Sequence, residues 1–328
     1  MNLRFVAIVF ICLSLIHCNS NKVAGPKEVL NLTVYTTVNG LSSNGIDDLA
    51  IDQQDRIWIG TLYGLNVFDG VNWDTINAND GLPYEYDKVL HFDNQGTLWI
   101  GSYCNGNGLI KYDGQTFRLF TTADGLSDNA IMSIASQSDG TIWVGSCIDR
   151  ACRFDGSNWE CFDDSSFLNY QVYSICVEND SSIWFGTGDG VSHYDGKMWK
   201  KYLGRFESEQ GPNGGYYRKA IEAIYFDGQG IGWFAFQYGV YMYYKGEFHQ
   251  KILGDYAITS ISDIAQALNG DIWFSSYTKG VYRYSEGTWT NFNMEDGLPS
   301  TWVSSVEIDS KGNIWFGTLK GLVKVTMN

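Results

Sequence analysis

Short apolar runs recur at a nearly constant interval along most of this chain. Each run is five or six residues long, and turns rich in Gly, Asp and Asn separate it from the next. The period is marked by a Trp that lies between Ile, Leu, Val, Phe or Gly residues and is often followed by Gly and a small hydroxyl residue. Its copies lie 40 to 49 residues apart, at Trp58, Trp99, Trp143, Trp184, Trp233, Trp273 and Trp315. Four-stranded blades of a β-propeller have this period.

Within one repeat, apolar and polar positions alternate with a period of two, which predicts strands. The first repeat predicts strands at residues 46–51, 56–60, 65–69 and 72–77. Helical repeats would need apolar spacings of three and four residues over longer stretches. Asp-Gly pairs, which favour tight hairpins between the third and fourth strands, occur at residues 69–70, 113–114, 155–156 and 195–196.

The two ends of the repeat array predict how the ring closes. The last copy stops after its third strand, at residues 321–326, and an additional strand at residues 32–37 precedes the first copy. That additional strand and the loop after it match the outer strand and loop at residues 117–126. The sequence therefore predicts an all-β, seven-bladed propeller over residues 31–328, closed by its N-terminal strand, which removes an exposed sheet edge.

Residues 1–18 differ from the rest, with Arg4 near the start and an almost wholly apolar stretch after it. This stretch is too short to span a bilayer and is typical of a secretory signal. Residues 15–18 resemble the lipobox of bacterial lipoproteins, although His17 departs from the small residue that normally precedes the Cys. We expect export, lipidation at Cys18, a polar tether at residues 19–30, and a periplasmic, outer-membrane or cell-surface location.

The charge balance argues against nucleic acid as a partner. The chain has 22 Lys and Arg against 37 Asp and Glu, a formal net charge of −15, and such a field repels a phosphate backbone. The membrane is expected as a partner only through the lipid anchor.

Several phrases of the repeat resemble a known family. Asp-Gly-Leu begins at Asp80, Asp124 and Asp296, and Trp-Ile/Phe-Gly-Thr/Ser and Phe/Tyr-Asp-Gly follow it. The pattern is similar to that of two-component regulator propeller repeats over residues 31–328. The resemblance implies the sensor part of hybrid histidine kinases, in which paired propellers sense polysaccharide fragments. This chain offers one propeller, no transmembrane helix and no kinase, so the resemblance favours ligand or partner binding over direct signal transduction.

Loops that abandon the repeat are the candidate binding loops, because binding residues tend to lie on loops of a rigid scaffold. Asp-Gly-Leu is missing at residues 163–171, 203–220 and 253–259, and the second of these carries aromatic and basic residues. Tyr rings can stack on sugars while charged groups bind hydroxyls. The predicted ligand-binding residues are Tyr103, Arg150, Tyr216, Tyr217, Arg218, Lys219, Tyr238 and Tyr277. The alternatives are a tolerated surface insertion and Tyr rings packed between blades.

Cysteine pairing is partly open. The hairpin at residues 155–156 places Cys152 opposite Cys161, which is the most natural disulfide. Cys104 and Cys147 occupy corresponding loops of adjacent blades and could bridge, or Cys147 could pair with Cys152. No Cys-x-x-Cys or paired His accompanies them, so we expect no metal site and no cofactor.

No catalytic motif stands out. The four His residues fall in the signal, an inner strand, a third strand and an outer strand. The repeated Asp and Asn residues in the turns are turn formers, not calcium ligands.

The leading hypothesis is a module that binds a carbohydrate or polar small molecule. A protein-protein scaffold at the cell envelope is the second hypothesis. A propeller lyase of the streptogramin-inactivating type, which would need clustered His and Glu, is the third.

Overall fold

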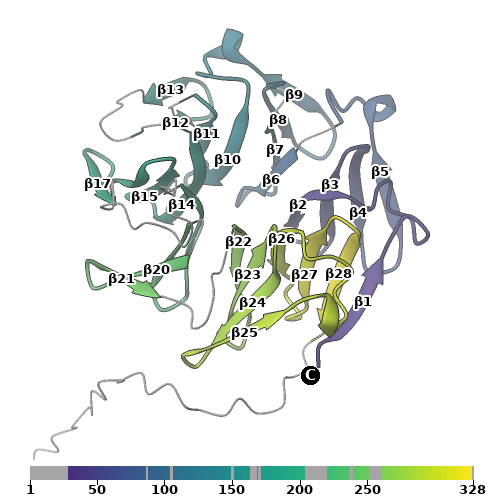
Figure 1. The fold of residues 1–328 in the computed structure, drawn as a ribbon. Coiled ribbons are helices and arrows are strands. Elements are labelled where there is room, and N and C mark those ends of the chain that lie inside the picture. Colours follow the sequence, from purple (N-terminus) through teal and green to yellow (C-terminus); the bar gives the residue numbers. More distant parts are fainter. Residues whose placement is uncertain are drawn as a thin grey trace, which may run out of the picture.

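A computed structural model shows a ring of seven four-stranded antiparallel sheets (Figure 1). It describes residues 29–85, 88–103, 106–148, 151–162, 168, 171–203, 220–236, 239–251 and 260–326. The predicted all-β, seven-bladed propeller is confirmed. The proposed signal and tether lie outside the described residues, apart from the last two positions of the tether.

Each blade runs from an inner strand at the centre of the ring to an outer strand at its edge. The inner strands are β2 (Ile46–Ile51), β6 (Lys88–Phe92), β10 (Ile131–Ser136), β14 (Val172–Asn179), β18 (Ile221–Phe226), β22 (Ile261–Gln266) and β26 (Val303–Ile308). The second strands, which carry the repeated Trp, are β3 (Ile57–Thr61), β7 (Leu98–Ser102), β11 (Ile142–Ser146), β15 (Ser182–Thr187), β19 (Gly232–Phe236), β23 (Ile272–Ser276) and β27 (Ile314–Thr318).

The third strands are β4 (Gly64–Phe68), β8 (Leu109–Tyr112), β12 (Ala151–Phe154), β16 (Gly190–Tyr194), β20 (Gly239–Tyr244), β24 (Gly280–Ser285) and β28 (Gly321–Thr326). The outer strands are β5 (Trp73–Ile76), β9 (Phe117–Phe120), β13 (Trp159–Phe162), β17 (Trp199–Leu203), β21 (Glu247–Lys251), β25 (Thr288–Phe292) and, in the seventh blade, β1 (Asn31–Tyr35). We number the blades from the one that begins with β2.

The N-terminal strand closes the ring as predicted. β1 pairs with β28 in antiparallel register from Asn31 opposite Thr326 to Tyr35 opposite Leu322, and Figure 1 shows this purple strand beside the yellow end of the chain. The Tyr35 ring contacts Trp315 of its own blade and Phe68 of blade 1. The strand therefore completes one sheet and also joins it to the next.

The core consists of seven apolar clusters, each formed between adjacent blades of the described chain. The Gly after the repeated Trp permits this contact. A Cβ on Gly145 would lie 2.7 Å from Val172 Cγ1 of the next blade, and one on Gly317 would lie 2.8 Å from Ile46 Cγ2. Real Cβ atoms do not come so close, so the repeated Gly records the close approach of neighbouring blades.

The Asp-Gly-Leu phrase forms a capped turn between an outer strand and the next inner strand. Short 3₁₀ helices are present at η1 (Ala78–Asp80), η2 (Thr122–Asp124) and η3 (Met294–Asp296), each with a capping box closed by the Asp of the phrase. The Gly that follows has positive φ, and the Leu is buried. The phrase is thus a structural device.

The Asp-Gly hairpins differ in detail from the expectation. Gly70 has a positive φ of 98° but Asp69 does not, and the connection spans four residues between Phe68 and Trp73. Asp69 instead accepts hydrogen bonds through Oδ1 from the N–H groups of Val71 and Asn72. Two-residue turns with positive φ at both positions occur in blades 5 and 6, at Lys245-Gly246 and Glu286-Gly287.

Candidate functional site

The two faces of the ring carry different connections. The loop face carries the loops from second to third strands and from each outer strand to the next inner strand. The hairpin face carries the remaining turns. Exposed large apolar side chains are frequent on the loop face, and they include Val38, Leu62, Tyr63, Tyr103, Ile148, Tyr277, Met294, Trp302 and Leu319.

Two half-buried carboxyl groups at the centre of the ring join inner strands of neighbouring blades. Asp48 Oδ2 on β2 accepts a hydrogen bond from Leu90 N on β6 at 2.8 Å. Asp263 Oδ2 on β22 accepts one from Val306 N on β26 at 3.0 Å, and a second from Ser305 Oγ at 3.2 Å. These bonds cross from one blade to the next, so the carboxyl groups help to hold the inner strands in register.

Burial raises the pKa of the carboxyl groups near the centre. Desolvation, together with the nearby Asp263, raises the pKa of Asp48 to about 7. Desolvation raises the pKa of Asp263 to about 6 and that of Glu222 to about 7, and the pKa of Glu307 is also well above its usual range. Burial disfavours the charged form of each of these carboxyl groups, and nearby carboxylates add to this effect at Asp48 and Glu307.

Tyr277 links this acidic centre to the loop face. It lies on the turn between β23 and β24, and burial followed by the influence of Tyr103, Asp48, Glu222 and Asp263 raises its pKa. Part of the ring still reaches solvent, with 37% of the residue exposed. The phenol therefore lies where the centre of the ring opens onto the loop face.

The predicted ligand-binding residues fall into two groups. Tyr103 and Tyr277 both lie between a second and a third strand, in blades 2 and 6, and both are partly exposed. Tyr103 is also one of the groups that raise the pKa of Tyr277. The other predicted residues, and the three irregular loops almost entirely, lie outside the described residues. These are Arg150, Tyr216, Tyr217, Arg218, Lys219 and Tyr238.

Trp302 is a site residue that the sequence reasoning missed. Its ring centroid lies 5.1 Å from that of Tyr277, and 47% of the residue is exposed. It lies thirteen residues before the Trp of its blade, a position that the other six blades fill with Gly45, Tyr86, Ala130, Gln171, Ala220 and Ser260. The sequence alone does not single it out, because blade 2 also has an aromatic residue, Tyr86, at this position.

The carboxyl residues of the inner strands were also missed. Asp48 and Asp263 occupy the same repeat position, ten residues before the Trp of their blades, where other blades have Ser or apolar residues. Acidic side chains on an otherwise apolar or small-residue inner strand could have been noticed.

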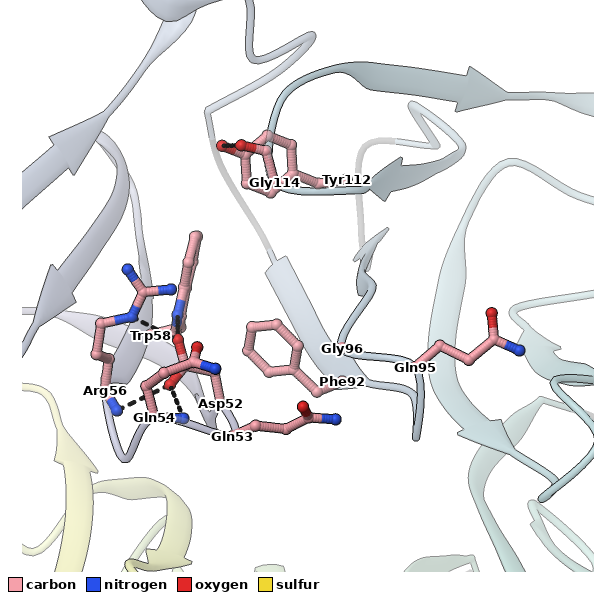
Figure 2. A pocket seen from close by; sticks show the side chains of 10 residues that line it. All are labelled: Asp52, Gln53, Gln54, Arg56, Trp58, Phe92, Gln95, Gly96, Tyr112 and Gly114. Carbon is pink, nitrogen blue, oxygen red and sulfur yellow. Dashed lines mark hydrogen bonds and ion pairs between the residues drawn. The ribbon is translucent and has the colours of Figure 1, made fainter.

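Two hollows on the hairpin face lie between adjacent blades. One, of about 200 Å³ between blades 1 and 2, is lined by residues that include Asp52, Arg56, Trp58, Phe92 and Tyr112 (Figure 2). The other, of about 350 Å³, lies between blades 3 and 4.

The carboxylate of Asp52 in the first hollow already has its partners. Asp52 Oδ2 accepts hydrogen bonds from Arg56 Nε at 2.6 Å and from Trp58 Nε1 at 2.9 Å (Figure 2). Asp52 Oδ1 accepts two more, from the N–H groups of Gln54 and Arg56. Both carboxylate oxygens of Asp52 are therefore already occupied by hydrogen bonds from the turn and from Trp58. For this reason, the loop face offers the better candidate site.

The turn residues do not form a cation site in the described structure. No group of three or more His, Cys, Asp or Glu side chains in the described segments is arranged to hold a metal ion. The Asp residues of the turns bind backbone N–H groups, as the sequence predicted.

Cys152 and Cys161 form a disulfide between β12 and β13, where they lie directly opposite one another. This arrangement excludes a Cys147–Cys152 pair. Cys147 Sγ lies 3.9 Å from the carbonyl oxygen of Tyr103, and Cys104 lies outside the described residues.

The described His residues lie apart. His91 is on inner strand β6, where burial lowers its pKa to about 4 and Nε2 contacts Ser136 Oγ at 2.9 Å. His193 is on third strand β16 and packs on Trp184, whereas His249 is on outer strand β21. His193 is linked to a carboxylate, because the Ser182 hydroxyl lies 2.6 Å from Glu178 Oε2 and 2.7 Å from His193 Nε2. None of the described helices has the length and apolar character to span a bilayer.

A family model described as two component regulator propeller matches residues 40–63, 125–147 and 297–320. These segments contain the loop, inner strand and Trp strand of blades 1, 3 and 7. No curated protein matches the chain.

Solved structures share the fold at low sequence identity. The extracellular domain of a protein named as a hybrid two component system from B. thetaiotaomicron is 19% identical, with a TM-score of 0.75 over 91% of this chain and 42% of its own. Virginiamycin B lyase from Staphylococcus aureus is 14% identical, with a TM-score of 0.73 over 91% of this chain and 100% of its own. PorZ, a surface component of the type-IX secretion system of Porphyromonas gingivalis, is 15% identical, with a TM-score of 0.66 over 87% of this chain and 47% of its own.

The chain spans less than half the length of the hybrid two component system domain that it matches. At these identities, the similarity shows that this chain has the propeller fold. It does not transfer the activity of any of these proteins to this chain.

Proposed function

Because this chain carries two component regulator propeller repeats, we propose that it is a ligand-binding module whose site is the centre of the loop face. One observation carries the proposal: the partly exposed rings of Tyr277 and Trp302 lie with their centroids 5.1 Å apart on the loop face, and the carboxyl groups of Asp48, Glu222 and Asp263 are near enough to Tyr277 to raise its pKa. Aromatic rings beside a few convergent polar groups are typical of sites for small ligands. The chain resembles extracellular sensor domains, and ligand binding would fit that resemblance.

The chemistry of the site suits a carbohydrate or polar small molecule. Tyr277 and Trp302 offer ring faces to solvent, and apolar faces of a ligand can stack on such rings. The carboxyl groups below them can bind hydroxyl groups, whether they donate or accept the hydrogen bond.

A thermal-shift screen of the full chain against sugars and other polar metabolites tests this function. We expect a ligand that raises the Tm of the wild type and has little effect on the Tm of Tyr277→Ala, because the site has lost its ring. Tyr244→Ala is the matched control, since Tyr244 is 45% exposed on the hairpin face. Equal stabilisation of Tyr277→Ala and the wild type would place the site elsewhere.

We further propose that the protein is exported and held at the membrane by a lipid on Cys18. The support is the sequence of residues 1–18, which lie outside the described residues, and the extracellular nature of the sensor domains that share the fold.

A protein-protein scaffold is the second candidate function. Leu62, Tyr63, Ile148 and Leu319 are each at least half exposed on the loop face, and exposed apolar side chains mark interaction surfaces when they are contiguous. Crosslinking of the full chain in its envelope, compared between the wild type and Ile148→Asp, tests this candidate. Loss of a crosslinked partner with unchanged small-ligand binding would favour the scaffold.

A further inference from the structure

We propose that the outer hairpins of blades 4 and 5 dock on the surface of an anionic phospholipid bilayer. Five exposed residues at these hairpins, which we call the basic edge, make the contact: Lys197, Met198, Lys200, Tyr244 and Lys245. The inference concerns a surface other than the candidate ligand site, because the basic edge belongs to the hairpin face. It goes beyond the expectation that the membrane is a partner only through a lipid anchor.

Basic residues are concentrated at these two blades although the chain as a whole is acidic. The third-to-outer hairpins and outer strands of blades 4 and 5, residues 195–203 and 244–251, contain five Lys and two acidic residues. The corresponding segments of blades 1, 2, 3 and 6 contain one Arg and six acidic residues; they are residues 69–76, 113–120, 155–162 and 285–292. The repeat therefore does not require Lys at these positions.

The side chains of the basic edge are available for a partner. Lys197, Lys200 and Lys245 are exposed, and none of them forms an ion pair with a described residue. Met198 is 69% exposed and Tyr244 is 45% exposed. Both apolar side chains lie next to a Lys in the sequence, so apolar surface and positive charge occur together at both hairpins.

Aromatic contacts join the two hairpins into one surface. The Tyr202 ring on β17 lies 5.7 Å from the Tyr243 ring on β20 and 5.8 Å from the Phe248 ring on β21, between centroids. Lys200 Nζ lies 4.2 Å from the centroid of Tyr202, and Lys245 Nζ lies 4.9 Å from that of Tyr244, the residue after Tyr243. Figure 1 shows β17 and β21 at the same side of the ring.

Nearby carboxylates offset part of this charge. Lys201 does not belong to the basic edge, because its Nζ is paired with Asp189 Oδ2 at 2.7 Å. Asp195 Oδ1 accepts hydrogen bonds from the N–H groups of Lys197 and Met198, and Glu247 is exposed in the second hairpin. Three exposed Lys residues against these two carboxylates still leave the edge positive.

The remainder of the hairpin face restricts the contact to this edge. Asp69, Asp113 and Asp155 are exposed on the corresponding hairpins of blades 1, 2 and 3. An anionic surface would repel them, and such repulsion acts over about one Debye length, roughly 10 Å. The ring is therefore expected to tilt, with blades 4 and 5 toward the bilayer.

An anionic bilayer matches both components of the basic edge. Lys residues are attracted to anionic head groups, and Tyr favours the boundary between head groups and acyl chains because its ring is apolar and its hydroxyl is polar. Met198 is a flexible apolar side chain at a hairpin tip, which can enter the same boundary. A soluble polyanion would use the Lys residues but would leave the exposed Met and Tyr without a role.

The course of the N-terminal strand agrees with this orientation. Asn31 pairs with Thr326 at the hairpin face, and Tyr35 pairs with Leu322 beside the loop face. The chain before β1 therefore enters the ring from the hairpin face. The ten residues between Cys18 and Val29 can extend over about 35 Å, so an anchor at Cys18 would be compatible with docking at blades 4 and 5. The loop face would then point away from the bilayer.

Vesicle co-sedimentation tests the inference. All seven sheets and the closing strand lie within residues 29–326, so a chain that begins at residue 29 keeps the complete ring and removes the proposed anchor. We expect it to bind vesicles of phosphatidylcholine with about 30% phosphatidylglycerol and to bind pure phosphatidylcholine at least about tenfold more weakly. Binding should also weaken when the salt concentration rises from about 0.05 M to about 0.5 M, because salt screens the charges.

The double variant Lys200→Gln/Lys245→Gln should bind the anionic vesicles at least about tenfold more weakly, since each Lys near the surface contributes about fivefold. The matched control is Lys279→Gln/Lys320→Gln, which removes the same charge from exposed residues of the loop face and should bind like the wild type. Met198→Ser should weaken binding by about threefold, because it removes an apolar side chain that enters the boundary.

Three outcomes would overturn the inference. These are equal binding of anionic and neutral vesicles, an equal loss in the two double variants, and no binding to either vesicle. If Met198→Ser binds like the wild type, the surface recognises negative charge alone, and a bilayer is the wrong partner. The ligand site on the loop face is tested separately, because a ligand that raises the Tm of the wild type should also raise that of Lys200→Gln/Lys245→Gln.

Discussion

At the scale of single residues, one polar side chain holds the repeated Trp through its indole N–H in every blade except blade 6. Asp309 Oδ2 accepts a hydrogen bond from Trp315 Nε1 at 3.0 Å, and Asp309 Oδ1 accepts from the N–H of Asn313 at 2.8 Å. In blade 3, Gln137 Oε1 accepts the corresponding hydrogen bond from Trp143 Nε1 at 2.7 Å. Ala267 occupies this position in blade 6.

The Trp273 indole of blade 6 consequently has an Nε1 that is buried and makes no hydrogen bond with the described residues. We expect Ala267→Gln to stabilise the protein by about 1 kcal/mol, because it supplies the acceptor that Gln137 provides in blade 3. The free energy of unfolding in urea would measure the change. Ala267→Met is the control, since it has similar size but no strong acceptor, and a gain as large in Ala267→Met would assign the effect to packing.

The carboxyl groups at the centre of the ring predict a pH dependence of stability. Their pKa values are raised in the folded protein, to about 7 for Asp48 and about 6 for Asp263, against about 4 in an unfolded chain. The folded state therefore binds more protons between these values. These two groups make their full contribution to the stability of the folded state below about pH 4, and this contribution is lost as the pH rises through about 7.

We expect the Tm to fall between pH 5 and pH 8, and Asp48→Asn to reduce this fall. The contribution of Asp48 is up to about 4 kcal/mol. Asp69→Asn is the control, because hydrogen bonds from the Asn72 backbone and side chain lower the pKa of that exposed residue, which takes its titration below this window. Thermal melts that show the same fall in Asp48→Asn as in the wild type would contradict the assignment.

At the scale of elements, each outer strand leads into a capped turn or a longer loop, and the N-terminal strand replaces the missing outer strand. β1 pairs with the outer edge of β28 over five residue pairs. Tyr35 adds ring contacts with Phe68, Trp73 and Trp315. This strand is the only described element whose blade partners come from the opposite end of the sequence.

A chain that begins at residue 39 should therefore be much less stable than one that begins at residue 29. The shorter chain loses the strand that closes the ring and exposes a sheet edge. We expect its Tm to fall by more than about 10 °C, because loss of several buried contacts costs several kcal/mol. Equal melting temperatures for the two chains would show that closure at β1 contributes little to stability.

At the scale of the whole molecule, the propeller presents one face on which aromatic and acidic groups converge. The orientation of that face toward its surroundings depends on how the chain is held. Residues 1–18 predict a lipid anchor, and a tether of the length of residues 19–30 would leave the ring free to turn.

Cys18→Ala should block incorporation of labelled fatty acid and release the protein from membranes, because the thiol is the proposed attachment point. Cys12→Ala is the matched control, since Cys12 lies in the same segment but outside the lipobox. Fractionation of cells that express each variant would measure the effect. Membrane association that is the same in Cys18→Ala and the wild type would show that the anchor is elsewhere or absent.

The sequence by itself determined the fold. Seven Trp-centred phrases, alternation with a period of two and a truncated last copy were sufficient to predict seven blades and their closure by the N-terminal strand. This was possible because each blade is built from contacts between residues that are near one another in the sequence. The residues that make these contacts recur in each of the seven repeats. Even the Gly that follows the Trp in five of the seven blades could be recognised from repetition, although the close approach that explains it could not.

Only the tertiary structure decided which residues form the candidate site. Asp48 comes from blade 1, whereas Glu222 and Asp263 come from blades 5 and 6, and closure of the ring brings these distant parts of the sequence around one centre. The inner strands also contain a register shift, as between Ile46 and Asp48 or between Ile261 and Asp263. Such a bulge breaks the period of two, so alternation alone cannot tell which side chains face the centre. For this reason, the sequence could predict the scaffold but not the meeting of Tyr277, Trp302 and the acidic centre.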